Sequence, residues 1–148
     1  MIVSLRQAAS PDEPYLWQLH KTTMQPLVEQ VWGWDDDVQH EFFRAYIDRG
    51  DLSLILADGR VVGAMQYHDE PDHDFLSQIE IAPEYQGNGF GSAVIGNLQA
   101  EAARNGKPIR LQVLKVNVSA ARLYRRLGFL DTGQTDTHLL MTWSPIAP

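Results

Sequence analysis

The sequence predicts a mixed α+β protein in which helices flank a central sheet of mixed strand direction. Two observations lead to this fold class. Strand-type alternation and helix-type spacing of apolar residues interchange along the 148 residues. Three strand patterns follow one another directly between residues 52 and 81, and further helices and strands come after them. The length is typical of one domain, so we expect a single domain over residues 1–148.

The N-terminal third predicts one strand and several helical segments. Ile2–Arg6 alternates as a half-buried strand does. Ser10 is placed to cap a helix that ends near His20, because a proline follows at the first helical position and a glutamate lies three residues later. Pro26 predicts a break within Lys21–Trp34, with a second short helix rather than one continuous rod.

A further helix is expected after the three aspartates at residues 35–37, which can cap it. Its apolar residues Val38, Phe42, Ala45 and Tyr46 share one side at helical spacing. The remaining elements are expected as strands at Leu52–Ala57, Val61–Tyr67, Phe75–Ile81, Ile109–Val116 and His138–Trp143, and as helices at Gly91–Arg104 and Val118–Leu127. The strand Ile109–Val116 is nearly all apolar, which predicts burial on both of its faces.

The composition argues against several classes of protein. Nineteen acidic and twelve basic residues give a net charge of −7, which argues against binding a nucleic-acid backbone. The absence of cysteine excludes disulfide frameworks, thiolate nucleophiles and cysteine-ligated metals. The chain opens without a basic and apolar leader, and no run approaches the 18 or so apolar residues of a membrane span. We therefore expect a soluble, cytoplasmic protein with neither nucleic acid nor membrane among its partners.

The stretch from Ile79 to Ser92 carries the most information about function. A strand there runs into a glycine-rich turn and then into a helix, whose N-terminal N–H groups form an anion site. Glycine lets the backbone approach phosphate oxygens because no Cβ intervenes. No lysine follows Gly91 as in a Walker loop, and Ser92 stands where a dinucleotide fingerprint has its third glycine. The pattern that remains is Gln86-x-x-Gly89-x-Gly91.

Two motifs together resemble the Gcn5-related N-acetyltransferase family. The pattern from Gln86 to Gly91 is similar to the family's pyrophosphate loop, Arg/Gln-x-x-Gly-x-Gly/Ala. The stretch from Asn117 to Phe129 is similar to a later family motif, Asn-x-x-Ala-x-x-Leu-Tyr-x-x-x-Gly-Phe. The resemblance implies the acyl-CoA N-acyltransferase fold, with a mixed, mostly antiparallel sheet, and it implies acetyl-CoA as co-substrate.

The resemblance also implies which residues contact acetyl-CoA. The pantetheine arm would pair with the backbone of Ile79 and Ile81, where the strand Phe75–Ile81 splays from its parallel neighbour Ile109–Val116. Asn117 would hydrogen-bond the same arm. The residues expected to wrap the pyrophosphate are Gln86, Gly87, Asn88, Gly89, Phe90, Gly91 and Ser92.

Tyr124 is the catalytic acid that the resemblance implies, and a phenol of pKa about 10 stays protonated at neutral pH. The base is less defined, although an amine of pKa about 10 is only about 0.1% neutral at pH 7 and must lose a proton before it attacks. Glu80 is the candidate because it is the only carboxylate inside the two splayed strands, but alternation places it opposite Ile79 and Ile81. The alternatives are a solvated or helix-facing Glu80, and a proton relay through water at Gln112 or through a residue of the early helices.

The acceptor pocket is expected in the early helical segment, where members of the family build theirs. Glu29, Trp32 and Trp34 could bound it, with the carboxylate holding an ammonium group, and core or interface tryptophans are the equal alternative. Gln112 is assigned to the same acceptor site. The histidines and acidic residues at 68–74 match no zinc spacing, and we expect no metal.

These observations predict an acetyl-CoA-dependent N-acetyltransferase that acetylates a primary amine of a small molecule. Direct attack in a ternary complex is expected, because no cysteine can carry an acyl group. Protein or peptide acetylation and a non-catalytic acyl-CoA-binding module stay open as alternatives. The apolar strand His138–Trp143 suggests pairing across a homodimer. The sequence does not identify the amine.

Overall fold

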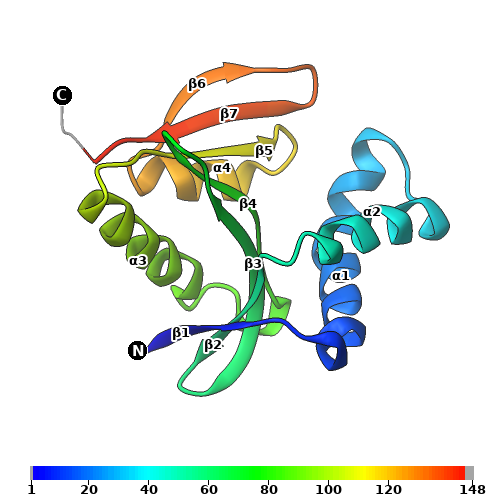
Figure 1. Ribbon diagram of the computed structural model, residues 1–148. Helices are drawn as coiled ribbons and strands as arrows, with labels where there is room; N and C mark the ends of the chain where they lie inside the picture. Colours follow the sequence, from blue (N-terminus) through cyan, green and yellow to red (C-terminus); the bar gives the residue numbers. More distant parts are fainter. Residues whose placement is uncertain (1, 146–148) are drawn as a thin grey trace. The chain divides into compact units, whose positions relative to one another are not determined.

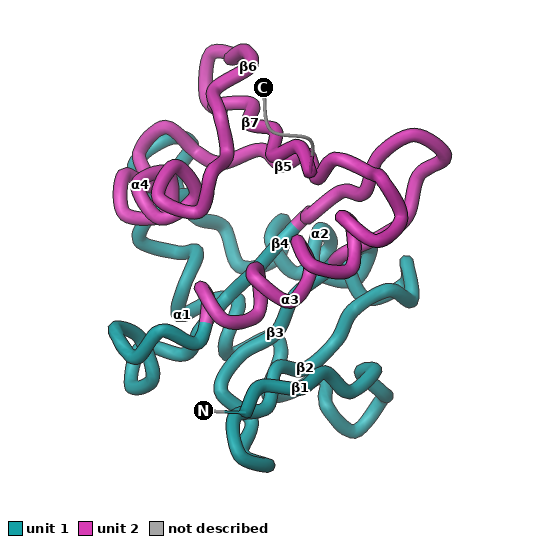
Figure 2. Tube along the Cα trace, turned by 90° about the vertical axis from the view of Figure 1, so that its left-hand side faces the viewer, with its two compact units in different colours: residues 1–66, 78–90 teal, residues 67–77, 91–148 magenta. Residues whose placement is uncertain are grey.

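The computed structural model describes residues 2–145, which form two compact units (Figure 2). Unit 1 contains the residues up to Gln66 together with Gln78–Phe90, and unit 2 contains Tyr67–Ser77 and the residues from Gly91 onward. The strands follow the hydrogen-bonded order β1-β2-β3-β4-β5-β7-β6, and one of the pairings, β4 with β5, is parallel (Figure 1). The predicted fold class, mixed α+β with a mostly antiparallel sheet, is confirmed.

Unit 1 begins with an antiparallel set of strands. β1 (Val3–Gln7) pairs with β2 (Leu52–Ala57), and β2 pairs with β3 (Arg60–Asp69). The turn between β2 and β3 consists of Asp58 and Gly59, whose φ angles are +52° and +83°. Such angles suit a tight hairpin turn, and the predicted hairpin is therefore confirmed.

The strand β4 (Asp74–Ile81) approaches β3 very closely within unit 1. The backbone N–H of Ala82 donates to the carbonyl of Val62 at 2.9 Å. A Cβ added to Gly63 would lie 2.1 Å from the backbone oxygen of Glu80. Only glycine therefore fits at position 63 without moving the backbone of one of the two strands.

The helix α1 (Glu13–Val31) is continuous, so the predicted break at Pro26 is wrong. A proline inside a helix removes one backbone hydrogen bond, at a cost of about 3 kcal/mol. Residues on both sides of Pro26 offset that cost, because Leu16, Leu19 and Val28 are all buried. The side-chain amide of Gln30 also donates to the Pro26 carbonyl at 2.9 Å.

The entry into α1 differs from the prediction as well. Ser10 does not cap the helix; it begins a short 3-10 turn, Ser10–Asp12. The backbone N–H of Ala9 donates to Asp12 Oδ2 at 2.8 Å. The Asp12 carboxylate, two residues after Ser10, therefore accepts the backbone hydrogen bond at this end of the helix. Ser10 was expected to supply that acceptor.

The helix α2 (Asp36–Asp48) begins as predicted, because Asp35 Oδ1 accepts from the N–H of Val38 at 3.1 Å. Phe43 is the residue of α2 that enters the core, at 2% exposure, whereas Val38 and Phe42 stay exposed. The core of unit 1 contains buried side chains from α1, α2, β2, β3 and the residue that follows β4, which are Leu16, Leu19, Phe43, Leu52, Leu54, Ala64 and Ala82.

In unit 2, β4 and β5 (Ile109–Leu114) pair in parallel over three residue pairs, which end at Leu76 and Leu111. β5 also pairs antiparallel with β7 (His138–Trp143), and β7 pairs in turn with β6 (Leu130–Gln134). Both edges of β7 are thus occupied, so the expected pairing of this strand across a homodimer is wrong. Homodimerisation itself stays a prediction.

The apolar sequence of β5 predicted burial on both of its faces, and this prediction is wrong. Arg110 and Gln112 are exposed and alternate with buried residues, so one face of β5 is open to solvent at these positions. The helices of unit 2 are α3 (Phe90–Arg104) and α4 (Val118–Arg126), and both match their predicted bounds within one residue. None of the helices within residues 2–145 is both long and apolar enough to span a membrane.

A buried acid stabilises unit 2. The Asp74 side chain is 3% exposed, accepts a hydrogen bond from the Tyr67 hydroxyl at 2.5 Å and lies 2.9 Å from Lys107 Nζ. Burial alone would raise the pKa of Asp74, but the hydrogen bonds from Tyr67 and Lys107 outweigh it and hold this pKa below its ordinary value. Asp74 therefore contributes stability above the ordinary aspartate pKa of about 3.9, and this contribution is lost as the pH falls through the lowered pKa.

Replacing Tyr67 by phenylalanine removes one donor to this buried carboxylate. We expect Tyr67→Phe to lower the free energy of unfolding at pH 7 by about 1–3 kcal/mol. The difference from the parent protein should shrink below about pH 4, because a protonated Asp74 no longer needs the donor. Urea unfolding across this pH range measures it, with Tyr15→Phe as the control because Tyr15 is 38% exposed. A difference that is constant with pH would show that Asp74 is not the group involved.

The close approach at Gly63 gives a second prediction. We expect Gly63→Ala to lower the free energy of unfolding by about 3 kcal/mol, because the new Cβ forces β3 away from the Glu80 carbonyl. Gly96→Ala is the matched control, since a Cβ at this position in α3 meets nothing within 4 Å. The control should be neutral or stabilising by up to about 1 kcal/mol. Equal effects of the two substitutions in urea unfolding would refute the steric argument.

Candidate functional site

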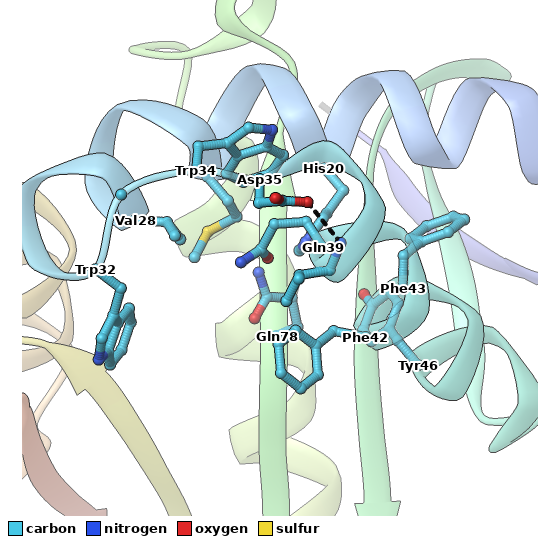
Figure 3. Close-up of a pocket in the computed structure, with 13 residues that line it drawn as sticks. His20, Val28, Trp32, Trp34, Asp35, Gln39, Phe42, Phe43, Tyr46 and Gln78 are labelled. Carbon is cyan, nitrogen blue, oxygen red and sulfur yellow. Dashed lines mark hydrogen bonds between the residues drawn. The ribbon is translucent and has the colours of Figure 1, made fainter.

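A cavity of about 820 Å³ lies within unit 1 (Figure 3). Its walls come from α1, from the link between α1 and α2, from α2 itself and from one residue of β4. The lining residues are His20, Met24, Val28, Trp32, Gly33, Trp34, Asp35, Val38, Gln39, Phe42, Phe43, Tyr46 and Gln78. A cavity of this size can hold a small organic molecule.

The walls of the cavity are mainly aromatic and aliphatic. Trp32 and Phe42 are 60% and 64% exposed, so they leave large apolar surfaces open. Trp34 is held in place because its indole N–H donates to Asp36 Oδ1 at 2.6 Å. This hydrogen bond, followed by one from Lys21, lowers the pKa of Asp36. Exposed apolar surface within a cavity favours a ligand with an apolar body.

Among the described residues that line the cavity, the one carboxylate already has a structural role. Asp35 Oδ1 accepts from the Val38 N–H at 3.1 Å and so caps α2, as the dashed line in Figure 3 marks. The cavity is therefore not built as a cluster of acids.

A group of polar side chains lies where α1 approaches β4. Glu80 is buried, at 4% exposure, and its Oε2 atom has three polar neighbours. His20 Nδ1 lies at 2.9 Å, Thr23 Oγ1 at 3.0 Å and Gln78 Nε2 at 2.9 Å. This position agrees with the alternation along β4, which placed Glu80 on the face opposite Ile79 and Ile81. Of the two alternative environments expected for Glu80, the helix-facing one is confirmed and the solvated one is wrong.

Tyr46 lies beside this polar group. Its ring stacks on that of His20, with centroids 6.0 Å apart and an interplanar angle of 28°. Its hydroxyl is buried and has no hydrogen-bond partner within residues 2–145. Burial first, and then the charges of Glu80 and Asp51, raise the pKa of Tyr46. The phenol is therefore neutral at physiological pH and can donate a hydrogen bond to a ligand.

Of the four predicted acceptor residues, two line this cavity. Trp32 and Trp34 do so, as the family resemblance implied for the early helical segment. Glu29 points elsewhere: it is exposed and accepts from Gln25 Nε2 at 2.8 Å. Gln112 belongs to β5 in unit 2 and is exposed. The sequence reasoning missed His20, Tyr46 and Gln78 as lining residues.

The predicted anion loop starts at the end of β4, in unit 1. A 3-10 turn (Pro83–Tyr85) follows the strand, and Gly87 and Gly89 then have φ angles of +80° and +81°. These left-handed angles explain the glycines, and α3 begins at the next residue, Phe90. The first turn of the helix holds the predicted Gly91 and Ser92.

Two side chains of the loop hold its own backbone. Gln86 Nε2 donates to the Ile81 carbonyl at 2.9 Å. Asn88 Nδ2 donates to the Tyr85 carbonyl at 3.1 Å. Gln86 and Asn88 therefore shape the loop, and the backbone N–H groups at the start of α3 remain the groups that suit an anion.

The predicted residues of α4 lie in unit 2. Asn117 Oδ1 accepts from the Ala120 N–H at 3.3 Å and caps the helix, so its amide N–H₂ is the part suited to donate to a ligand. Tyr124 is 8% exposed and meets the Phe129 ring edge-on, with centroids 5.8 Å apart. Burial raises the pKa of Tyr124 to about 12, so this phenol is protonated at neutral pH.

The polar residues at 68–74 form local pairs in unit 2. His73 Nδ1 lies 2.7 Å from Asp72 Oδ1, and the His68 ring stacks on Phe75. No group of three or more histidine, aspartate or glutamate side chains within residues 2–145 is arranged to hold a metal ion.

A strand that leads through left-handed glycines into a helix N-terminus is the arrangement by which many α/β proteins bind a phosphate group. The fold and this loop define the class. The chain belongs to the acetyltransferase (GNAT) family, whose model matches residues 5–129. The resemblance found in the two sequence motifs is thereby confirmed.

The relatives agree with this assignment. The chain is 32% identical over 89 residues to a spermine/spermidine N(1)-acetyltransferase of Bacillus subtilis, covering 53% of this chain and 59% of that protein. It is 36% identical over 63 residues to a thialysine N-epsilon-acetyltransferase of Bos taurus, covering 42% and 37%. The chain therefore spans less than two thirds of the length of either relative.

Solved structures share the fold. The PaiA N-acetyltransferase of Thermoplasma acidophilum, solved in complex with coenzyme A, matches with a TM-score of 0.76 and 14% sequence identity. The match covers 97% of this chain and 99% of that one.

Proposed function

We propose that the protein is an acetyl-CoA-dependent N-acetyltransferase that acetylates a primary amine of a small molecule. Membership of the family over residues 5–129 is the observation that carries the reaction type. The cavity in unit 1 supports a small acceptor, since its volume of about 820 Å³ suits a metabolite-sized ligand.

Acetyl transfer would occur by direct attack of the amine on the thioester. The chain contains no cysteine, so a thioester-linked enzyme intermediate is not available. The carbon–nitrogen bond forms, the carbon–sulfur bond breaks, and the thiolate of CoA leaves. Tyr124 is the proposed acid at the sulfur, which its neutral phenol supports.

The residues proposed to bind acetyl-CoA follow the two motifs. The left-handed glycines and the helix start support the loop from Gln86 to Ser92 as the pyrophosphate site. The backbone groups of Ile79 and Ile81 and the amide N–H₂ of Asn117 are proposed to bind the pantetheine arm. Each of these groups is a backbone or neutral amide partner, which suits the amides of pantetheine.

The lining of the cavity supports an amine with an apolar body as acceptor. One relative acts on spermine and spermidine, which are polycations. The cavity of this chain is lined by Trp32, Trp34 and Phe42, and the carboxylate of Asp35, which also lines it, already caps a helix. Aromatic walls favour an aromatic or aliphatic substituent over a second charged amine.

Binding and turnover can be tested with the purified protein. We expect acetyl-CoA to raise the melting temperature, and CoA thiol release to be at least tenfold more efficient with 2-phenylethylamine than with spermidine. Phe42→Ala should raise KM for the aromatic amine about tenfold and leave KM for acetyl-CoA unchanged, because it removes a wall of the cavity. Leu130→Ala is the matched control, since this apolar side chain is similarly exposed and lies in unit 2.

Each outcome of this experiment separates one alternative. No binding at millimolar acetyl-CoA would refute the proposal. Binding without turnover on any amine would favour a non-catalytic acyl-CoA-binding module. Turnover on peptides alone would favour protein or peptide acetylation, and preference for spermidine would refute the apolar acceptor.

The role of Tyr124 gives a separate prediction. Tyr124→Phe should lower kcat about 100-fold with little change in KM for acetyl-CoA, because the ring contact with Phe129 remains and only the acid is lost. Steady-state kinetics measure this, with Tyr15→Phe as the control for removal of a tyrosine hydroxyl. An unchanged kcat would exclude Tyr124 as the acid.

A further inference from the structure

Glu80 is too enclosed to meet a substrate itself. Its side chain is 3% exposed, and it does not belong to the residues that line the cavity. The atom Oε2 already has three polar neighbours, from α1 and from β4. A carboxylate in this position can act on the reaction only through one of them.

His20 is the neighbour that connects Glu80 to the cavity. Its side chain is 14% exposed and belongs to the cavity lining. An ionised carboxylate can only accept hydrogen bonds, so the Nδ1 atom of His20 carries the hydrogen and donates it to Glu80 at 2.9 Å. The lone pair of a neutral ring then lies on Nε2, the atom that is free to accept a proton.

The other groups around His20 leave Glu80 as its charged partner. Tyr46 of α2 stacks on the ring and is neutral, since its pKa is raised. Phe43 and Trp17 pack on the same ring, and they are apolar. His40 lies against Trp17, with ring centroids 4.7 Å apart, and does not line the cavity. Burial first, and then nearby charges that include Glu80, raise the pKa of Tyr15, so this phenol is neutral as well.

We propose that His20 is the general base of the transferase and that Glu80 is the residue that positions it. This inference rests on the proposed function. The substrate ammonium group gives a proton to His20 Nε2, and the neutral amine attacks the thioester carbonyl. The new carbon–nitrogen bond replaces the carbon–sulfur bond. After the attack the nitrogen loses a second proton. The first proton passes through His20 to solvent, and the second replaces the proton that Tyr124, the proposed acid, gives to the departing thiolate. The products are the amide, the CoA thiol and one proton.

Glu80 has two effects in this scheme. It fixes the tautomer by accepting from Nδ1, and its negative charge stabilises the imidazolium that forms when Nε2 takes the proton. Gln78 Nε2 and Thr23 Oγ1 orient the carboxylate in turn. Thr23 Oγ1 also lies 3.0 Å from the Leu19 carbonyl and 3.4 Å from the His20 carbonyl, so its single hydrogen is shared among three acceptors.

The test compares pH profiles of kcat/KM for the amine. We expect His20→Gln to lower kcat/KM at pH 7 about 100-fold, without changing KM for acetyl-CoA. The variant should recover as the pH rises towards the pKa of the amine, about 10, because the amine then loses its proton without a base. Glu80→Gln should lower kcat/KM at pH 7 about tenfold. Like His20→Gln, this variant should recover as the pH rises towards the pKa of the amine. Added imidazole should restore activity to His20→Ala.

His40→Gln is the matched control, because His40 belongs to the same aromatic cluster and lies outside the cavity lining. Its profile should superimpose on that of the parent enzyme. A His20→Gln profile that also superimposes on the parent would overturn the proposal while leaving the acetyltransferase function intact. No turnover by the parent enzyme would overturn both.

A measurement on the free parent protein does not depend on the variants' folding. The ¹⁵N shifts of the His20 ring in the parent protein should show the hydrogen on Nδ1. A ring protonated on Nε2 in the parent would overturn the proposal, since no lone pair would then be presented to the amine.

Discussion

The buried carboxylate of Glu80 constrains how α1 and β4 can pack in unit 1. On its side-chain face, donors from His20 and Gln78 converge on one oxygen atom. On its backbone face, the carbonyl of the same residue leaves no room for a Cβ at position 63. An uncompensated buried charge costs several kcal/mol, so β4 cannot shift along α1 without losing the donor that His20 of α1 supplies. One residue thus couples the register of a strand to the position of a helix that also lines the cavity.

The parts of the fold that could be predicted are those with local signals. The hairpin at Asp58 and Gly59, and the helix capped by Asn117, need only the chemistry of adjacent residues. The continuous α1 could not be predicted, because the burial that offsets Pro26 comes from residues far away in sequence. The exposed face of β5 was missed for a similar reason, since an apolar sequence does not reveal what covers it.

The same distinction applies to the site. The anion loop could be predicted because its glycines and the helix that follows occupy consecutive positions. Glu80 could be singled out as a carboxylate within a strand, yet its partner His20 is 60 residues away and has no motif of its own. Alternation along β4 does place Gln78 on the same face as Glu80, and that signal could have identified Gln78. Trp32 and Trp34 were found because members of the family build their acceptor pocket in the early helical segment, and that resemblance does not specify which other residues complete the cavity.

The apolar walls and the polar end of the cavity address the same chemical barrier. Transfer of an ammonium group from water to an aromatic cavity removes hydration, and desolvation favours the neutral form of an amine. The carboxylate of Asp35 is engaged with the Val38 N–H, so it compensates less for that lost hydration than an unpartnered acid would. The proposed base at His20 then accepts a proton that the cavity already makes easier to release. A polycationic acceptor would bring a second ammonium group, and the proposed base accepts a proton from only one. The apolar walls that favour deprotonation of the first amine would therefore penalise burial of the second, charged one.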